Sequence, residues 1–82
     1  MELFKVYIIK SVRVERYYIG STSDLEKRVN SHNSSSARWT KRFQPWEVVY
    51  TESYLTRGEA VKREKFLKSL KNIKKFLEMD KS

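Results

Sequence analysis

The sequence of 82 residues has no cysteine, one proline, two glycines and one histidine. Without cysteine, disulfide bonds and thiolate metal sites are excluded, and a single histidine leaves no zinc-binding spacing. Gly20 and Gly58 stand far apart, so the chain has no glycine-rich loop for phosphate. A Ser-His-acid triad would have to use His32, which no nucleophile elbow accompanies. These chemistries are therefore poorly supported.

Long hydrophobic runs are also absent. The longest apolar stretch near the N-terminus, Val6 to Ile9, is far shorter than a membrane span and lacks the layout of a signal peptide. We therefore expect a cytoplasmic protein with no membrane partner. A chain of this length is too short to divide, so we expect one domain over residues 1–82, with a frayed C-terminal end from about residue 79.

What the sequence does have is an excess of positive charge. Eighteen lysine and arginine residues against ten acidic residues give a formal net charge of +8. A small chain with this excess attracts polyanions, and nucleic acid is the first candidate partner. The alternative is a soluble protein that is basic for no functional reason.

The N-terminal part of the sequence predicts a β-hairpin. Leu3 to Ile9 is apolar and rich in β-branched residues, and Arg16 to Gly20 has the composition of a second strand. If the two strands pair in antiparallel fashion, Tyr7 and Tyr18 can lie across from each other. The connection from Ser11 to Glu15 has no glycine or asparagine to fix the turn, so the register stays open.

A polar segment after the second strand predicts a helix from Leu25 to about Asn33, which Ser23 or Asp24 can cap. Two rows of residues run along this helix at i,i+4 spacing. We expect the apolar row to face the sheet and the polar row to lie at the edge of the buried stripe. The rows are Leu25 with Val29, and Arg28 with His32.

Three consecutive serines, Ser34 to Ser36, end the helical pattern, and a loop follows as far as Pro45. Basic residues alternate with aromatic ones along this loop, which is the composition of a nucleic-acid contact. The basic residues that we expect to bind nucleic acid are Arg38, Lys41 and Arg42, and the aromatic ones are Trp39 and Phe43.

The C-terminal half predicts a third strand and two more helices. The strand runs from Trp46 to Tyr54, and its alternation places three large side chains on one face: Trp46, Val48 and Tyr50. The sequence from Thr56 to Glu59 has the form of a capping box and opens a helix to about Leu70. A last short helix is expected from Ile73 to Met79.

Five polar residues could together serve phosphodiester hydrolysis. The reaction needs an activated water, neutralisation of the developing charge and help for the departing oxygen. A tyrosine or histidine can supply the base, and an arginine can clamp the phosphate. A glutamate can hold a divalent metal ion whose other ligands are water and phosphate oxygens. The candidates are Tyr7, Tyr18, Arg28, His32 and Glu64.

Each candidate also has a structural interpretation. The two tyrosines can be half-buried packing residues of the strands, and Arg28 can be a solvated helix residue. His32 near a helix C-terminus can complement the macrodipole, which contributes a few tenths of a kcal/mol to about 1 kcal/mol. Glu64 lies within the apolar arc of its helix but shares it with Arg63, and it can pair with Lys65 or Lys68. The combination is more informative than any one member.

The order and spacing of these residues resemble the GIY-YIG nuclease domain, especially its small stand-alone bacterial members. The matching elements are Lys5-Val6-Tyr7, Tyr18-Ile19-Gly20, Arg28, His32 and the distant Glu64. The chain is also similar to the N-terminal nuclease domain found in the excision-repair endonuclease. The resemblance extends from Phe4 to about Leu70 and implies an α+β fold. In that fold a three-stranded antiparallel sheet is flanked by helices in the order β-β-α-β-α, followed here by a short C-terminal helix.

The resemblance also implies an activity, the hydrolytic cleavage of DNA with a divalent metal ion, Mg²⁺ or Mn²⁺. Tyr7 and Tyr18 correspond to the two motif tyrosines, one of which helps to activate the attacking water. Arg28 corresponds to the phosphate-stabilising arginine, and His32 to a residue that assists proton transfer or orients a tyrosine. The single metal-binding carboxylate corresponds to Glu64. Gly20 would allow the backbone and the substrate to approach closely.

Three functions remain open at this point. The first is a DNA endonuclease of repair, recombination or mobile-element processing, which recognises DNA structure or backbone or relies on an unidentified protein partner for specificity. The second is a nucleic-acid-binding module that has kept the fold and the basic surface but not the turnover. The third is a protein-interaction adaptor whose charge serves only solubility.

Overall fold

The structure, a computed structural model, describes residues 3–34 and 40–80. In chain order the elements are β1 (Phe4–Ser11), β2 (Tyr17–Thr22), α1 (Leu25–His32), the 3₁₀ turn η1 (Thr40–Phe43), β3 (Trp46–Tyr54), α2 (Arg57–Lys68) and α3 (Ile73–Asp80). The α+β class and the order of the elements are as predicted, and only η1 is missing from the prediction. The last helix continues to Asp80, and residues 81–82 lie outside the described residues.

The central strand β1 is buried on both faces. Four consecutive residues, Val6 to Ile9, have no exposed surface. Such an unbroken apolar run is typical of a strand that is covered from both sides. β1 pairs in antiparallel fashion with β2 and with β3, so the sheet order is β2-β1-β3 and the two outer strands form its edges.

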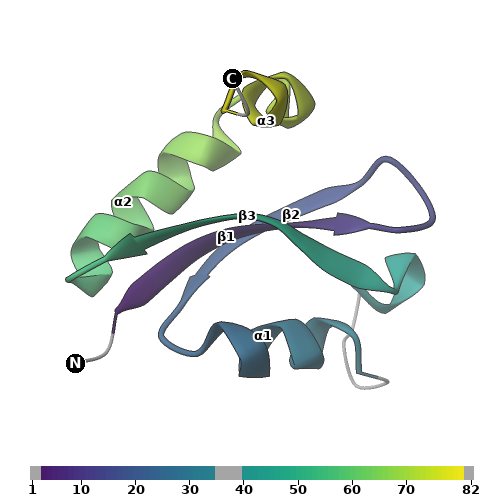
Figure 1. The fold of residues 1–82 in the computed structure, drawn as a ribbon, viewed down its shortest axis with the longest axis horizontal. Coiled ribbons are helices and arrows are strands. Elements are labelled where there is room, and N and C mark those ends of the chain that lie inside the picture. Colours follow the sequence, from purple (N-terminus) through teal and green to yellow (C-terminus); the bar gives the residue numbers. More distant parts are fainter. Residues whose placement is uncertain (1–2, 35–39, 81–82) are drawn as a thin grey trace.

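The helices cover the two faces of the sheet unequally. Figure 1 shows α1 on one face, and α2 followed by α3 on the other. Leu25 and Val29 of α1 pack against the first face as predicted, with Tyr7, Ile9 and Trp46 of the strands. The core of the second face is built from Val6, Ile8, Ile19, Ala60 and Leu67. Alternate residues of β1 therefore belong to different cores.

The pairing of β1 with β2 differs from the expected one by two residues. Tyr7 lies opposite Gly20, and Tyr18 lies opposite Ile9. The two tyrosines are therefore diagonal neighbours on the α1 face rather than direct partners. Aromatic side chains reach across such a diagonal, and the two rings stack with their centroids 6.5 Å apart and their planes inclined by 27°.

The prediction that Trp46, Val48 and Tyr50 share one face is wrong. Ile8 pairs with Tyr50, but the next residue of β1 pairs with Val48, so β3 has one extra residue at this point. Beyond the extra residue of such a β-bulge, side chains that would have faced one side of the sheet face the other side. Trp46 therefore packs in the core under α1, whereas Tyr50 packs under α2 and α3.

The helices begin at the predicted caps. The Asp24 carboxylate accepts a hydrogen bond from the Lys27 N–H at 3.1 Å, so Asp24 rather than Ser23 caps α1. The Thr56 hydroxyl accepts from the Glu59 N–H at 3.2 Å and caps α2. These bonds satisfy N–H groups that have no partner inside the helix. Among the helices of the described ranges, none has the length and apolar composition to cross a bilayer.

Candidate active site

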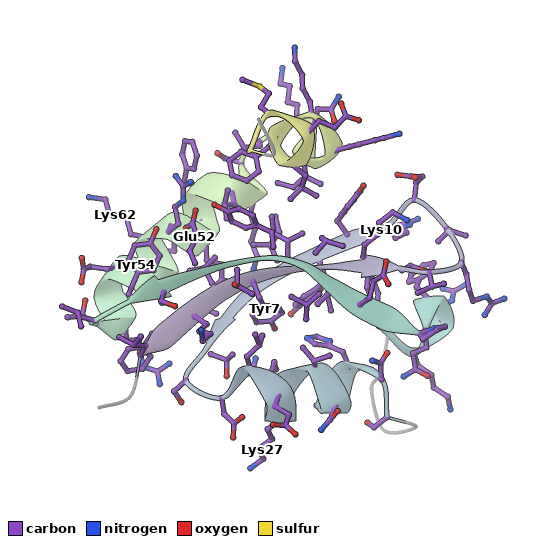
Figure 2. The ribbon with its side chains drawn as sticks, in the orientation of Figure 1. Tyr7, Lys10, Lys27, Glu52, Tyr54 and Lys62 are labelled. Carbon is purple, nitrogen blue, oxygen red and sulfur yellow. The ribbon has the colours of Figure 1, made fainter. Side chains whose placement is uncertain are left out.

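A hydrogen-bonded tyrosine and histidine lie between the sheet and α1. Tyr7 stands in the middle of β1, and its side chain points toward α1 (Figure 2). His32 is the last residue of α1. Tyr7 Oη and His32 Nε2 are 3.1 Å apart, and both residues are buried. The sequence predicted that His32 would lie at the rim of the sheet, and the structure places it deeper, against Tyr7.

Gly20 makes room for this pair. A Cβ atom at Gly20 would lie 2.5 Å from Tyr7 Oη and 2.7 Å from Tyr7 Cζ, well inside van der Waals contact. No glycine of the described chain has a positive φ, so the requirement at this position is for space and not for backbone conformation. The space that was expected to admit the substrate is filled by the Tyr7 ring.

Burial keeps both members of the pair uncharged at neutral pH. It raises the pKa of Tyr7 to about 12, although the nearby Arg28 guanidinium acts in the opposite direction. Burial also lowers the pKa of His32, and the positive charge of Arg28 lowers it further. A neutral imidazole is the form that can accept a proton as a general base, and the hydrogen bond between Nε2 and the phenol oxygen holds it in place.

Tyr18 and Arg28 complete what we call the Tyr7 cluster, which consists of Tyr7, Tyr18, Arg28 and His32. The Tyr18 ring lies 4.6 Å from the His32 ring, centroid to centroid, and is only partly buried. Arg28 is exposed on α1, and its charge acts on both Tyr7 and His32. It lines a shallow hollow of about 450 Å³ with five other residues: Thr22, Ser23, Asp24, Lys27 and Ser31.

Glu64 approaches this cluster from the other face of the sheet. It belongs to α2, and its Oε1 accepts a hydrogen bond of 2.6 Å from the Ser21 hydroxyl on the edge strand β2. Ser21 follows Gly20, so its side chain points to the face opposite the Tyr7 cluster. For so small a core the sequence predicts that the inward edges of both helices meet the hairpin, so that Glu64 would share one concave surface with Tyr18. The structure differs, because α1 and α2 lie on opposite faces of the sheet.

The carboxylate is nevertheless electrostatically linked to the Tyr7 cluster around the β2 edge. Burial pushes the pKa of Glu64 up, but hydrogen bonds from Lys68 and Ser21 and the charges of Lys68 and Arg28 outweigh it, so that the pKa lies below its usual value. The Glu64 charge in turn contributes to the raised pKa of Tyr7. Lys68 Nζ is 2.7 Å from Glu64 Oε2, which confirms one of the two ion pairs that the sequence allowed.

The donor set around Glu64 suits a hard divalent cation. It offers a carboxylate and a hydroxyl, and Mg²⁺ typically takes one or two carboxylates and completes its shell with water and substrate phosphate. In residues 3–34 and 40–80 no three histidine, cysteine, aspartate or glutamate residues gather as a metal cluster. A site here would therefore depend on Glu64 as its only carboxylate ligand.

Arg63, the neighbour of Glu64, belongs to a second polar cluster at the opposite edge of the sheet. Its guanidinium donates to both oxygens of Glu52 at 2.9–3.2 Å, and the hydroxyls of Tyr50 and Tyr54 donate to the same carboxylate. Figure 2 shows Glu52 and Tyr54 on the side of α2, away from Tyr7. We call Tyr50, Glu52, Tyr54 and Arg63 the Glu52 cluster.

Sequence reasoning missed three residues that hold the site in place. Ser21 fixes the Glu64 carboxylate, and its place in the strand alternation, next to Ile19 on the same face, could have drawn attention to it. Asn33 exchanges hydrogen bonds of 2.6 and 3.0 Å with the backbone of Trp46. Gln44 donates to the His32 carbonyl at 2.8 Å. Asn33 and Gln44 fix the end of α1 from which His32 projects.

Two of the three predicted nucleic-acid-binding residues lie beside this end of α1. Lys41 and Arg42 are exposed in η1, next to Gln44, which is bonded to α1. Arg38 lies outside the described residues, as does Trp39. The structure therefore places two of the three predicted basic residues on the side of the sheet that carries the Tyr7 cluster.

Comparison with known proteins assigns the family. The model described as "GIY-YIG catalytic domain" matches residues 4–76. The chain belongs to the GIY-YIG family. This membership places it in a nuclease family and confirms the resemblance seen in the sequence. No solved structure gives a significant match.

The relatives that the chain matches are small UPF0213 proteins. It is 39% identical over 72 residues to UPF0213 protein YazA of Bacillus subtilis (strain 168), covering 87% of this chain and 72% of the relative. It is 37% identical over 76 residues to UPF0213 protein SSP2268 of Staphylococcus saprophyticus, covering 92% of each chain. UPF0213 protein NP_0776A of Natronomonas pharaonis is 37% identical over 71 residues, with 85% and 82% covered. None of these names states an activity.

Proposed function

We propose that this GIY-YIG protein is a metal-dependent DNA endonuclease. The observation that carries the proposal is the neutral Tyr7–His32 pair with Arg28 on one side of the β2 edge and the Glu64 carboxylate on the other. This arrangement offers a proton acceptor, a phosphate clamp and a metal ligand within one electrostatic neighbourhood. Phosphodiester hydrolysis needs these three functions.

In the proposed reaction the Tyr7 cluster handles the proton and the phosphate charge. Tyr18, the more accessible tyrosine, orients the attacking water. His32 is in its neutral, basic form at pH 7 because its pKa is lowered, so it can accept the proton that the water loses. Tyr7 holds the imidazole in place through its hydroxyl. The exposed Arg28 guanidinium binds the phosphate oxygens on which negative charge develops.

Glu64 would hold the metal ion, Mg²⁺ or Mn²⁺, with Ser21 as a neighbouring oxygen donor. When bound, such an ion neutralises charge on the phosphate and lowers the pKa of a bound water. Lys68 occupies one carboxylate oxygen and would have to release it or share it. The ion pair is half exposed on the lysine side, so exchanging it has a small cost.

DNA would be recognised through its backbone or its structure, because the residues proposed for the contact are basic side chains suited to phosphate. The basic residues that we propose for this contact are Arg38, Lys41 and Arg42. An unidentified protein partner could add specificity. We place the enzyme in the cytoplasm, in repair, recombination or mobile-element processing.

The test is incubation with supercoiled plasmid and branched DNA in Mg²⁺, Mn²⁺ or chelator. Wild-type protein should nick DNA only with a metal ion, and Glu64→Gln should abolish nicking while DNA binding is kept or strengthened. Glu52→Gln is the matched control, because it makes the same chemical change in a carboxylate of similar exposure, 16% against 19%. It should cut normally.

Two results would contradict the proposal. Wild-type protein that binds DNA in a salt-sensitive way but never nicks it would favour a binding module on the same fold. Glu64→Gln protein that cuts as fast as wild type would remove Glu64 from the site or reveal a contaminating nuclease.

A further inference from the structure

The positive charge of the chain is concentrated between Lys62 and Lys75, from the middle of α2 to the start of α3. Residues 62–75 contain seven lysine and arginine residues and one glutamate, whereas residues 40–61 contain three basic and three acidic residues. Residues 62–75, which run from α2 through the connection to the start of α3, therefore carry a net charge of +6. These elements stand together on one face of the sheet, away from α1 (Figure 1).

A groove of about 480 Å³ runs between these helices and β2. Its lysines come from the end of α2, the connection and the start of α3, and they are Lys68, Lys71 and Lys74. Its partly exposed apolar lining comes from Tyr17, Leu70 and Ile73, and the buried Ile19 and Leu67 complete it. A groove with cationic sides and an apolar, partly aromatic floor suits a nucleic-acid strand, whose phosphates and sugar or base faces need both kinds of contact.

Two of these lysines are available for a ligand. Lys71 and Lys74 are exposed, and within the described ranges neither forms an ion pair with a carboxylate. The carboxylate that lines the groove, Glu15, is bonded to the Tyr17 hydroxyl and lies 3.9 Å from Lys10. Arg16 also lines the groove, but its guanidinium lies over the Phe43 ring and is already engaged there.

The groove is continuous with the candidate metal ligand. Lys68, which lines the groove, is bonded to Glu64, and Glu64 is bonded to Ser21 on β2. Ile19 of the groove floor lies two residues before Ser21 on the same face of that strand. A strand lying in the groove would therefore run along β2 toward the carboxylate.

We propose that this groove binds the sugar-phosphate backbone of a nucleic-acid strand and delivers it to Glu64. The inference rests on the proposed function, and it adds a binding surface that the loop residues Lys41 and Arg42 do not provide. An acidic protein segment would meet the same charge. Nucleic acid is favoured because the groove leads to a carboxylate that is placed to act on phosphate.

The experiment compares a groove variant and a loop variant, each of which loses two positive charges, with a control that loses one. Fluorescence anisotropy of a labelled single strand of about twenty nucleotides gives the affinity over a range of salt concentrations. The groove variant is Lys71→Gln/Lys74→Gln, the loop variant is Lys41→Gln/Arg42→Gln, and the control is Lys62→Gln, an exposed α2 lysine at the edge near Tyr54 (Figure 2). Unlabelled poly-L-glutamate is the competitor.

The groove variant should reduce the slope of log affinity against log salt by about 1.4, close to 0.7 for each lost phosphate contact. The control should leave the slope unchanged. The inference is overturned if the groove variant keeps the wild-type slope, if no form of the protein binds the strand, or if poly-L-glutamate competes as well as the unlabelled strand at equal charge.

Nicking by the same samples separates this inference from the proposed function. Wild-type protein that binds through the groove but does not nick contradicts the endonuclease and supports the groove. Groove-variant protein that still nicks and binds as well as wild type supports the endonuclease and contradicts the groove.

Discussion

The two faces of the sheet each carry a cluster of tyrosines around charged or titratable groups, and the clusters differ in charge balance. In the Glu52 cluster the carboxylate receives both donors of a bidentate arginine and two phenolic hydroxyls. In the Tyr7 cluster a neutral phenol is bonded to a neutral imidazole, and the cation, Arg28, has no carboxylate in ion-pair distance within the described residues.

This difference separates a structural cluster from a reactive one. A carboxylate whose lone pairs are occupied by fixed donors has nothing to offer a ligand, and its hydrogen bonds hold α2 to β3. An exposed guanidinium without a counter-ion can bind an external anion such as a phosphate. The Tyr7 cluster has one charged residue, Arg28, whereas the two charged residues of the Glu52 cluster, Glu52 and Arg63, neutralise each other.

Among substitutions within the two clusters, the largest effect should come from removing the uncompensated cation, Arg28. Arg28→Ala should slow DNA cleavage by about 2–4 kcal/mol in activation free energy, as is usual for a preorganised group that stabilises developing charge. The free energy of unfolding should change little, because Arg28 is exposed. Single-turnover cleavage and urea unfolding of the same sample measure the two quantities. A large loss of stability with normal cleavage would give Arg28 the structural role instead.

At the Glu52 cluster, on the opposite edge of the sheet, we expect a loss of stability and no loss of cleavage. Glu52→Gln removes the charge that Arg63, Tyr50 and Tyr54 share, and hydrogen bonds to charged groups contribute about 1.5–3 kcal/mol. Urea unfolding should show a loss in this range, with cleavage at low temperature unchanged. If stability were unaffected and cleavage lost, the functional site would lie at this edge.

Gly20→Ala tests whether the Tyr7 cluster depends on close packing. The added methyl group would collide with Tyr7 Oη and Cζ, which cannot retreat because Tyr7 is fully buried and bonded to His32. Overpacking of this kind costs about 1–3 kcal/mol in stability. Gly58→Ala is the control, since a Cβ atom there meets nothing within 4 Å. Equal stability of the two variants would show that Tyr7 can move aside.

The smallest effect should be a dependence of stability on pH that arises from His32. Its folded pKa lies below the ordinary 6.5, so the unfolded chain binds more protons in this window. The free energy of unfolding should therefore fall as the pH is lowered from 6.5 through the folded pKa, and it should be level above that window. Glu52 and Glu64 have lowered pKa values, so their contributions are lost only at lower pH, below about 4.5.

Urea unfolding as a function of pH, with His32→Gln as the control, measures this effect. His32 is the only histidine in the sequence, so its substitution should flatten the curve between about pH 5 and pH 7. A wild-type curve that is already flat there would mean that the imidazole is not held neutral in the folded protein.

The sequence predicted the elements well because their signals are local. Asp24 and Thr56 cap the helices where their side chains can bond to the next N–H groups, and the third strand has the predicted bounds. Leu25 and Val29 face the sheet together because i,i+4 spacing places both side chains on the same side of the helix. Membership of the family was also readable, from separated motifs along the chain.

The arrangement of the site could not be predicted because it depends on contacts between distant residues. Nothing near Glu64 in the sequence indicates that Ser21 holds it or that α2 covers the face opposite α1. Gly20 suggested space for a substrate to approach the backbone. The strand register instead pairs Gly20 with Tyr7, whose ring fills that space. Whether the five predicted residues act together in catalysis stays a prediction.

The bulge in β3 makes the length of that strand as important as its composition. One extra residue between the partners of Ile8 and Ile9 lets Trp46 seal one core and Tyr50 the other. Deleting a single residue from this stretch would turn one end of the strand over and present its large side chains to water. Relatives should therefore tolerate substitutions here more readily than insertions or deletions, and an alignment gap at Val49 would signal a rebuilt core rather than a trimmed loop.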